Sequence, residues 1–321
     1  LVRSMRKMQG RNKKMKKILP GVLIVVCIIS AVFGLISCGE VQKYDVVCTI
    51  FPQYDFVRNI AGDSLSVKML LPAGTDAHNY ELTTRDKSAI ANCSVFIYIG
   101  GESEKWVKDV RKSTNISKSI WLDLSKKVGL MDAVHDHEDE HDDHEETFDE
   151  HYYLSIRNAV DLCNAIAEEL SSAFPEKKGE FEANCKEYVS KLKDLDTLYE
   201  ETFAEMNDKK AYFADRYPFA YLFRDYGIEC DSLFGGCSTD TEITAQKKID
   251  FEKAFSLSGK SGVFVLENGN TKVAQSIVEK CGGKIYTLDS CQTVTKKELE
   301  NGTGYYEKMK KNLYVIKEGI R

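Results

Sequence analysis

The histidines of this chain are concentrated in one short segment, HDHEDEHDDHEETFDEH, at positions 135–151. These seventeen residues contain ten carboxylates and five of the six histidines, and the sixth is His78. Imidazole and carboxylate groups bind borderline and hard divalent cations, and a mixed set favours Zn²⁺ or Mn²⁺ over a soft, thiol-bound metal. An acidic linker whose histidines have no role is the alternative interpretation. Because histidine is almost absent elsewhere, the segment predicts metal handling.

No apolar period runs through this segment, which predicts a solvated loop rather than a packed helix or strand. Flexible ligands lose conformational entropy when they bind, so this loop is expected to hold metal far more weakly than a preformed cleft. The auxiliary, weak metal ligands predicted in this acidic loop, 135–150, are His135, His137, His141 and His144.

The first 37 residues have the order of a secretory signal. Eight basic residues precede the first acid, Glu40, and an apolar run occupies 18–36. This order describes a signal peptide, although the run is also about long enough to be an uncleaved membrane anchor. It ends in LISC at 35–38, which resembles the lipobox of bacterial lipoproteins. We therefore expect a signal peptide at 1–37, acylation of Cys38, and a protein anchored by lipid in the cell membrane, facing outside the cytoplasm.

Cleavage there makes the mature chain strongly acidic. It takes away eight of the 44 Lys and Arg residues and no acid, so 36 face 50 Asp and Glu and the formal charge changes from −6 to −14. Nucleic acid demands the opposite sign of charge and is excluded as a partner. An acidic exported protein is suited to gathering cations.

Two series of short β-rich runs alternate with amphipathic helical stretches from position 44 onward. Strands are predicted at 46–51, 66–71, 95–100 and 119–124, and again at 210–214, 228–234, 262–267 and 284–289. This alternation predicts an α/β fold of two lobes, each a parallel sheet flanked by helices. Ligands bind such sheets at the carboxyl ends of the strands, and His78 lies in the loop after the second strand.

One long helix is predicted between the two series, because apolar residues recur at steps of three and four from Glu180 to Met206. A coiled-coil partner and a rigid strut joining the lobes are the two interpretations, and the short apolar seam favours the strut. The predicted domains are an N-terminal lobe at 44–175, a linker helix at 176–206 and a C-terminal lobe at 207–321.

Four stretches resemble the zinc- and manganese-binding solute receptors of bacterial ABC importers, the ZnuA/TroA-like or cluster 9 family. They are TIFPQYDFVRNIAGD, LLPAGTDAHNYELTTRD, EHYYLSIRNA and YTLDS. The resemblance covers nearly all of 44–321, and an acidic His-rich loop before the second ligand is typical of its zinc branch. It implies one metal in a cleft between the lobes, with His78, His151 and Asp289 as ligands.

The chain departs from that family at the third ligand, a His or Glu expected in DRYPFAYLFRDYG, where Arg216 stands. A guanidinium stays protonated and has no lone pair, so it cannot bind a cation. Either Asp215 rotates into the site, or Arg216 pairs with Glu267 and the site has fewer protein ligands. Glu267 ends a strand and is predicted to bind the metal or to support a ligand, with a solvated side chain as the alternative.

Eight cysteines are left after the signal and Cys38, an even number that permits disulfides in an exported chain. No C-x-x-C pair occurs, which disfavours a zinc knuckle. Cys237 and Cys291 lie in loops near the inferred cleft. A disulfide, free thiols and thiolate ligation in place of Arg216 are the three interpretations.

The leading hypothesis is an extracytoplasmic receptor that captures Zn²⁺ between its lobes and delivers it to the membrane permease of an ABC importer. A manganese receptor, a metal-dependent surface adhesin and a metal buffer are alternatives. A metallohydrolase is the remaining rival, because His78, His151 and Asp289 would leave a coordination position open. No G-x-S-x-G, H-E-x-x-H or P-loop motif supports it, so no enzyme is predicted.

Overall fold

The computed structural model describes residues 43–113, 119–133, 148–235 and 243–321. The predicted signal peptide, Cys38, Cys237 and the four histidines of the acidic loop lie outside the described residues. So does most of that loop, up to position 147.

The first sheet has four parallel strands in the order β2-β1-β3-β4. The strands are β1 (Val46–Cys48), β2 (Val67–Met69), β3 (Val95–Tyr98) and β4 (Ile120–Asp123). The two central strands, β1 and β3, are buried at every position, as expected for strands rich in β-branched and aromatic residues with both faces covered. The edge strands are only partly buried.

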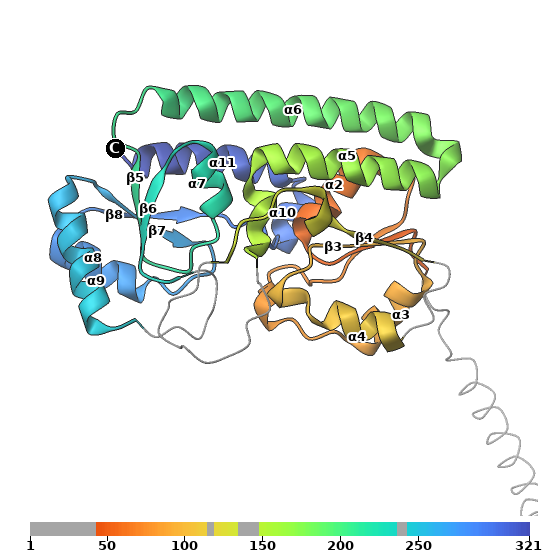
Figure 1. The fold of residues 1–321 in the computed structure, drawn as a ribbon, viewed down its shortest axis with the longest axis horizontal. Coiled ribbons are helices and arrows are strands. Elements are labelled where there is room, and N and C mark those ends of the chain that lie inside the picture. The colour runs from red at the N-terminus through yellow and green to blue at the C-terminus, as the bar shows by residue number, and fades with distance from the viewer. Residues whose placement is uncertain (1–42, 114–118, 134–147, 236–242) are drawn as a thin grey trace, which may run out of the picture. The chain divides into compact units, whose positions relative to one another are not determined.

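The second sheet repeats this arrangement, with four parallel strands in the order β6-β5-β7-β8. Its strands are β5 (Lys210–Phe213), β6 (Glu229–Ser232), β7 (Gly262–Leu266) and β8 (Lys284–Leu288). Two parallel sheets with the same strand order, each flanked by helices, confirm the predicted fold class (Figure 1).

Helices cover both faces of the first sheet because its strands send alternate side chains to opposite faces. Val46, Cys48 and Ile97 pack into the large core cluster with α2 (Phe51–Ala61) and α5 (Ile156–Ala173). Val47 and Phe96 point the other way, into a separate cluster formed with α3 (Thr84–Asn92) and α4 (Trp106–Ser113).

In the second half, Tyr212 and Val263 pack in the same manner against α8 (Ala245–Ser258) and α9 (Lys272–Cys281). Three further helices are α7 (Ala220–Asp225), α10 (Lys296–Glu300) and α11 (Tyr305–Gly319), and short 3-10 turns include η1 (Ala77–Asn79) and η4 (Glu150–Leu154). None of the described helices is both long enough and apolar enough to cross a membrane.

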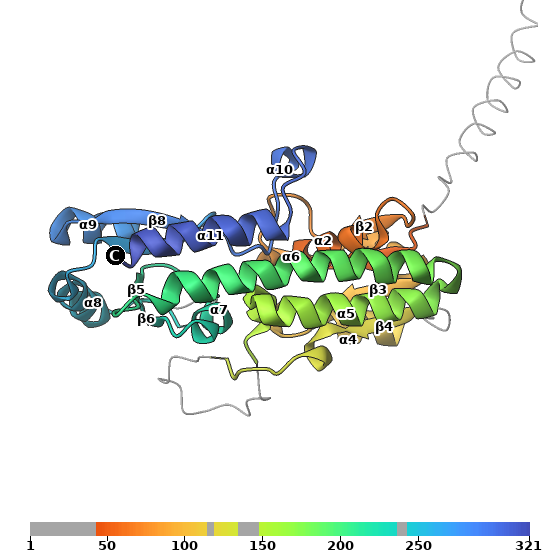
Figure 2. The same ribbon diagram turned by 90° about the horizontal axis from the view of Figure 1, so that it is seen from above.

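The predicted long helix is α6, a 27-residue helix at Lys178–Ala204. Figures 1 and 2 show it running along α5 and α11, so that it spans both sheets. Its buried side chains recur at steps of three and four, from Phe181 through Leu192 to Phe203. At its second half the hydroxyl of Tyr199 donates to the carbonyl of Met309 in α11 at 2.6 Å.

The N-terminus of α11 also ties the two halves together directly. The backbone N–H of Tyr305 donates to Asp55 Oδ2 in α2 at 3.0 Å. The Tyr305 hydroxyl donates to the carbonyl of Tyr153 in η4 at 2.6 Å. Burial raises the pKa of Asp55 to about 6, although the hydrogen bonds from Tyr305 and Tyr188 act in the opposite direction.

Candidate metal centre

His78 lies in η1, the single 3-10 turn that follows the carboxyl end of β2. Asp76 begins this turn, because its Oδ1 accepts the backbone N–H of His78 at 3.0 Å. Burial alone would raise the pKa of Asp76, but the hydrogen bonds from His78 and Arg216 outweigh it and lower that pKa. The aspartate is therefore held ionised beside the imidazole.

His151 lies in η4, and its local support repeats that of His78. Asp149 begins the turn by accepting the His151 N–H at 2.9 Å, and the same carboxylate oxygen lies 2.7 Å from His151 Nδ1. A carboxylate on one ring nitrogen orients the imidazole and assigns the other nitrogen to a cation. The same Asp-X-His turn, once in η1 and once in η4, thus positions each of the two histidines.

The expectation of a solvated loop is wrong for the last residues of the His-rich segment. Phe148 pairs with Asp132 in an isolated β-bridge. Glu150 and His151 are each only 5% exposed. The end of the segment belongs to the core because the apolar residues Tyr152, Tyr153 and Leu154 follow directly in the same turn and are fully buried.

Glu150, which the sequence did not single out, joins the two histidines. Its Oε1 lies 3.9 Å from His78 Nδ1. One potential ligand atom from each of His78, Glu150 and His151 lies within 4.8 Å of the others, the one such group of three among the described residues. In the sequence, Glu150 directly precedes the predicted ligand His151. Because many other carboxylates come before it, the sequence alone did not indicate which acid is buried beside the histidines.

A small pocket of about 30 Å³ opens at these histidines, large enough for one ion or water molecule. Both halves of the chain contribute to its wall, which consists of Asp76, His78, His151, Arg216, Pro218, Leu266, Glu267, Asn268, Ser290, Gln292 and Thr293.

Arg216 lines this pocket and pairs with Asp76 rather than with Glu267. Its Nη1 lies 3.1 Å from Asp76 Oδ2. The neighbouring Asp215 is buried and accepts the backbone N–H groups of Arg216 at 2.8 Å and of Leu266 at 3.1 Å. Its carboxylate is thus committed to the backbone, and the structure does not bring Asp215 into the histidine pair.

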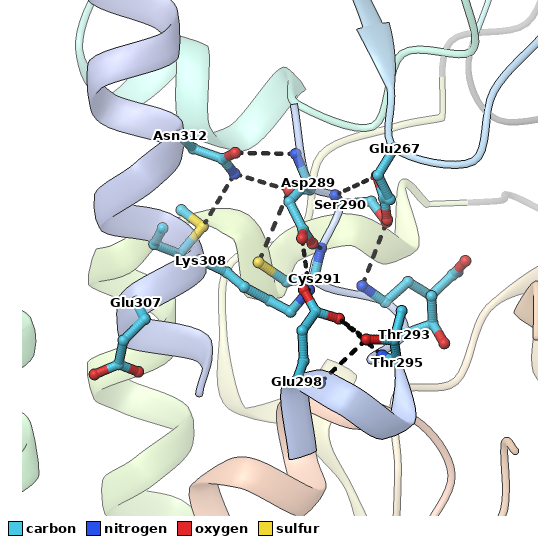
Figure 3. Close-up of polar contacts among 12 residues, drawn as sticks. Glu267, Asp289, Ser290, Cys291, Thr293, Thr295, Glu298, Glu307, Lys308 and Asn312 are labelled. Carbon is cyan, nitrogen blue, oxygen red and sulfur yellow. Dashed lines mark hydrogen bonds and ion pairs between the residues drawn. The ribbon is translucent and has the colours of Figure 1, made fainter. Parts of the chain in front are cut away.

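Glu267 also lines the pocket and is held by Ser290. One of its oxygens accepts the Ser290 N–H at 2.9 Å, and the other accepts the Ser290 hydroxyl at 2.8 Å (Figure 3). Burial raises the pKa of Glu267, and the nearby charge of Asp289 raises it further.

Asp289 lies outside the group of His78, Glu150 and His151. Its Oδ2 is 2.5 Å from the ammonium of Lys308, a residue of α11 that is only 4% exposed (Figure 3). Its Oδ1 accepts the N–H of Cys291 at 2.9 Å. The sequence did not single out Lys308, because an ion pair between the residue after β8 and α11 leaves no mark in a local pattern.

No cysteine joins His78, Glu150 and His151 in the group of possible metal ligands among the described residues. Seven cysteines, including Cys291, are free thiols there. Burial raises the pKa of the Cys291 thiol well above its usual range, and its sulfur faces the carbonyl of Asp289. Burial therefore favours the neutral form of this thiol.

The family model described as ZnuA, zinc-uptake complex component A, periplasmic, matches residues 46–319. The zinc-binding protein AdcA of Streptococcus pyogenes serotype M3 is 31% identical over 314 residues, which cover 92% of this chain and 61% of the relative. The high-affinity zinc uptake system protein ZnuA of Bacillus subtilis is 29% identical over 311 residues, covering 91% of this chain and 96% of the relative.

The zinc-binding lipoprotein AdcA of Streptococcus pneumoniae is 28% identical over 292 residues, 88% of this chain and 58% of that protein. The chain thus spans about three fifths of the length of the two streptococcal relatives. The Zn(II)-bound ZnuA-like domain of the S. pneumoniae protein has the same fold, with a TM-score of 0.72 and 27% identity over 87% of this chain and 99% of that domain.

Proposed function

This chain belongs to the ZnuA family of zinc-uptake components, and on that premise we propose that it captures Zn²⁺ outside the cytoplasm for an importer. The observation that carries the proposal is the convergence of His78 and His151 on one small pocket. Two imidazoles with carboxylates nearby suit Zn²⁺, which binds nitrogen and carboxylate oxygen in four-coordinate sites.

The position of the pocket supports capture and release rather than permanent storage. Its wall draws on both halves of the chain, so a shift of either half changes the site. The His78 side chain keeps 20% of its surface exposed, whereas that of His151 keeps 6%. We propose that the cation enters on the His78 side and that His151 forms the inner wall.

The partner in this proposal is the membrane permease of an ABC importer, which takes the metal from the receptor. The family description as a periplasmic component of an uptake complex supports this role. A lipid anchor at Cys38 would hold the receptor at the cell membrane, and the lipoprotein name of a streptococcal relative supports that anchor. Binding and hand-over require no bond chemistry, so we propose a receptor without catalytic turnover.

Metal titration of the purified chain without residues 1–38 tests the proposal. Competition against a chromophoric zinc chelator is expected to give one tight site per chain, and His78→Ala and His151→Ala are each expected to abolish it. His135→Ala is the matched control, because it removes the same side chain from the acidic loop and should leave the tight site intact. A wild-type chain without a tight zinc site, or with a tight Mn²⁺ site only, contradicts the proposal.

A further inference from the structure

We propose that Glu150 is the carboxylate ligand of the captured cation, in the place that resemblance to the family gives to Asp289. This inference rests on the proposed function and names a residue of the same site. It follows from comparing how each carboxylate around the pocket is already engaged.

Glu150 is fixed in position but keeps one oxygen for a ligand. Its Oε2 accepts the N–H of Ser103 at 2.9 Å. Its Oε1 is fully buried and accepts no hydrogen bond from the described residues, although it lies 3.9 Å from His78 Nδ1. A buried carboxylate oxygen without a donor is costly, and a cation bound beside it removes that cost.

The neighbouring loop is shaped to receive Glu150. Gly101 has a φ of +85°, and a Cβ built on it would lie 2.6 Å from Glu150 Oε2 and 2.9 Å from Glu150 Cβ. Only glycine tolerates both this backbone conformation and this close approach. The carboxylate is thus held against the 100–103 loop in one orientation, as a preformed ligand requires.

Asp289 is engaged instead with Lys308. The two side chains are buried and their charged atoms are 2.5 Å apart, and Lys308 Nζ also lies 3.1 Å from Glu298 (Figure 3). If Asp289 turned to a metal, Lys308 would keep only the partly exposed Glu298 as a partner for its buried ammonium. Breaking a buried pair in this way is strongly unfavourable.

The two carboxylates that line the pocket, Glu267 and Asp76, are likewise engaged. Both oxygens of Glu267 accept hydrogen bonds from Ser290. One oxygen of Asp76 accepts the N–H of His78 and the other faces Arg216. Glu150 therefore differs from Asp76 and Glu267 in having one buried oxygen that no donor among the described residues occupies.

Glu150→Gln tests the assignment, since the amide keeps the size of the side chain and an oxygen for Ser103. Zinc affinity is expected to fall by more than about 100-fold, because even the outer partners of ligands are worth about 10–100-fold. Glu104→Gln is the matched control: Glu104 is also 5% exposed and has an Oε1 without a hydrogen bond. Glu104 lies outside the group of His78, Glu150 and His151, so the Glu104→Gln variant should bind zinc with an affinity within a few-fold of wild type.

The converse variant is Asp289→Asn combined with Lys308→Met, which removes both charges of the buried pair together. Its zinc affinity should remain close to wild type, and thermal melts of all variants check that each is folded. The inference is overturned if the double variant no longer binds zinc while Glu150→Gln binds it fully. Asp289 would then be the carboxylate ligand. That result would leave the proposed function standing, whereas a wild-type chain without tight zinc binding would overturn both.

Zinc-soaked crystals of the wild-type chain give a readout that depends on no variant. An anomalous difference peak within bonding distance of Glu150 Oε1, His78 and His151 is the expected result. A peak bonded to the two histidines but not to Glu150 contradicts the inference.

Discussion

Arg216 and Asp76 form an ion pair on the wall of the pocket that His78 and His151 also line, with 3.1 Å between Nη1 and Oδ2. Asp76 also sets the turn that presents His78, through its other oxygen. The guanidinium is thus paired with the residue that orients His78, at the position where resemblance to the family predicts a neutral or anionic ligand. In the proposed site this ion pair offsets the positive charge of Arg216, which has no lone pair to offer a cation.

Arg216→His is expected to tighten zinc binding by about tenfold or more, because it removes a positive charge and adds a neutral nitrogen near the metal. Calorimetry at matched pH measures the change. Arg216→Lys is the control, since it keeps the charge and should give no gain. If the histidine variant binds zinc no better than wild type, the arginine is itself a working part of the site.

Deleting residues 135–146 is expected to lower the number of zinc ions bound while leaving the tightest affinity within a few-fold. The deletion removes the predicted weak ligands but keeps Asp149, Glu150 and His151, which η4 and its cap hold in place. Equilibrium dialysis over a range of zinc concentrations separates the two classes of site. Loss of the tight site on deletion would move the main site into the loop.

Cys38→Ala is expected to release the protein from the membrane fraction, because Cys38 is the predicted site of acylation. Fractionation of cells producing the full chain, followed by immunoblotting, measures the distribution. Cys48→Ala serves as the control, since Cys48 is a buried residue of β1 and its loss should not alter membrane partition. A Cys38→Ala protein that is cleaved yet still fully membrane-bound would refute the lipid anchor.

Asp55 is expected to make the fold less stable as the pH rises from about 4 to about 6. Burial raises its folded pKa to about 6, above the value of about 3.9 for an unfolded aspartate. The stabilisation that Asp55 gives to the folded state is therefore complete below the unfolded pKa, and it is lost as the pH rises through the folded pKa.

Asp55→Asn should remove this dependence, so that its unfolding free energy gains roughly 1–2 kcal/mol relative to wild type between about pH 4 and pH 7. Urea denaturation at several pH values measures the difference. Asp63→Asn, the same change at a fully solvated side chain paired with Arg58, should show no such trend. Parallel curves for wild type and Asp55→Asn would mean that Asp55 does not titrate in this range.

The sequence was sufficient for the fold because its signals are local. The buried strands β1, β3 and β7 are continuous runs of apolar residues, and α6 has a clear helical period. The short α10 has no buried face, so no apolar pattern predicts it. The limits of the lobes, 44–175 and 207–321, stay a prediction.

The candidate site was only partly predictable, because the state of its carboxylates depends on contacts between residues far apart in the sequence. Resemblance to the family picked out His78 and His151, which the structure brings to one pocket. It did not reveal that Lys308, nineteen residues after Asp289, holds that carboxylate in a buried ion pair. Nor did composition distinguish Glu150 from the other acids of its segment, since only the packing of η4 buries it.

The hydrogen bonds of Tyr305 to Asp55 and Tyr153 connect residues 250 and 152 positions apart in the chain. Contacts this distant in sequence close late, because a long loop must be ordered before they form. During synthesis the N-terminal half therefore emerges long before Tyr305, which donates hydrogen bonds to Asp55 and to the carbonyl of Tyr153. We expect the growing chain to reach its native packing only after the start of α11 has been made, which would favour export of an unfolded polypeptide and folding on the far side of the membrane.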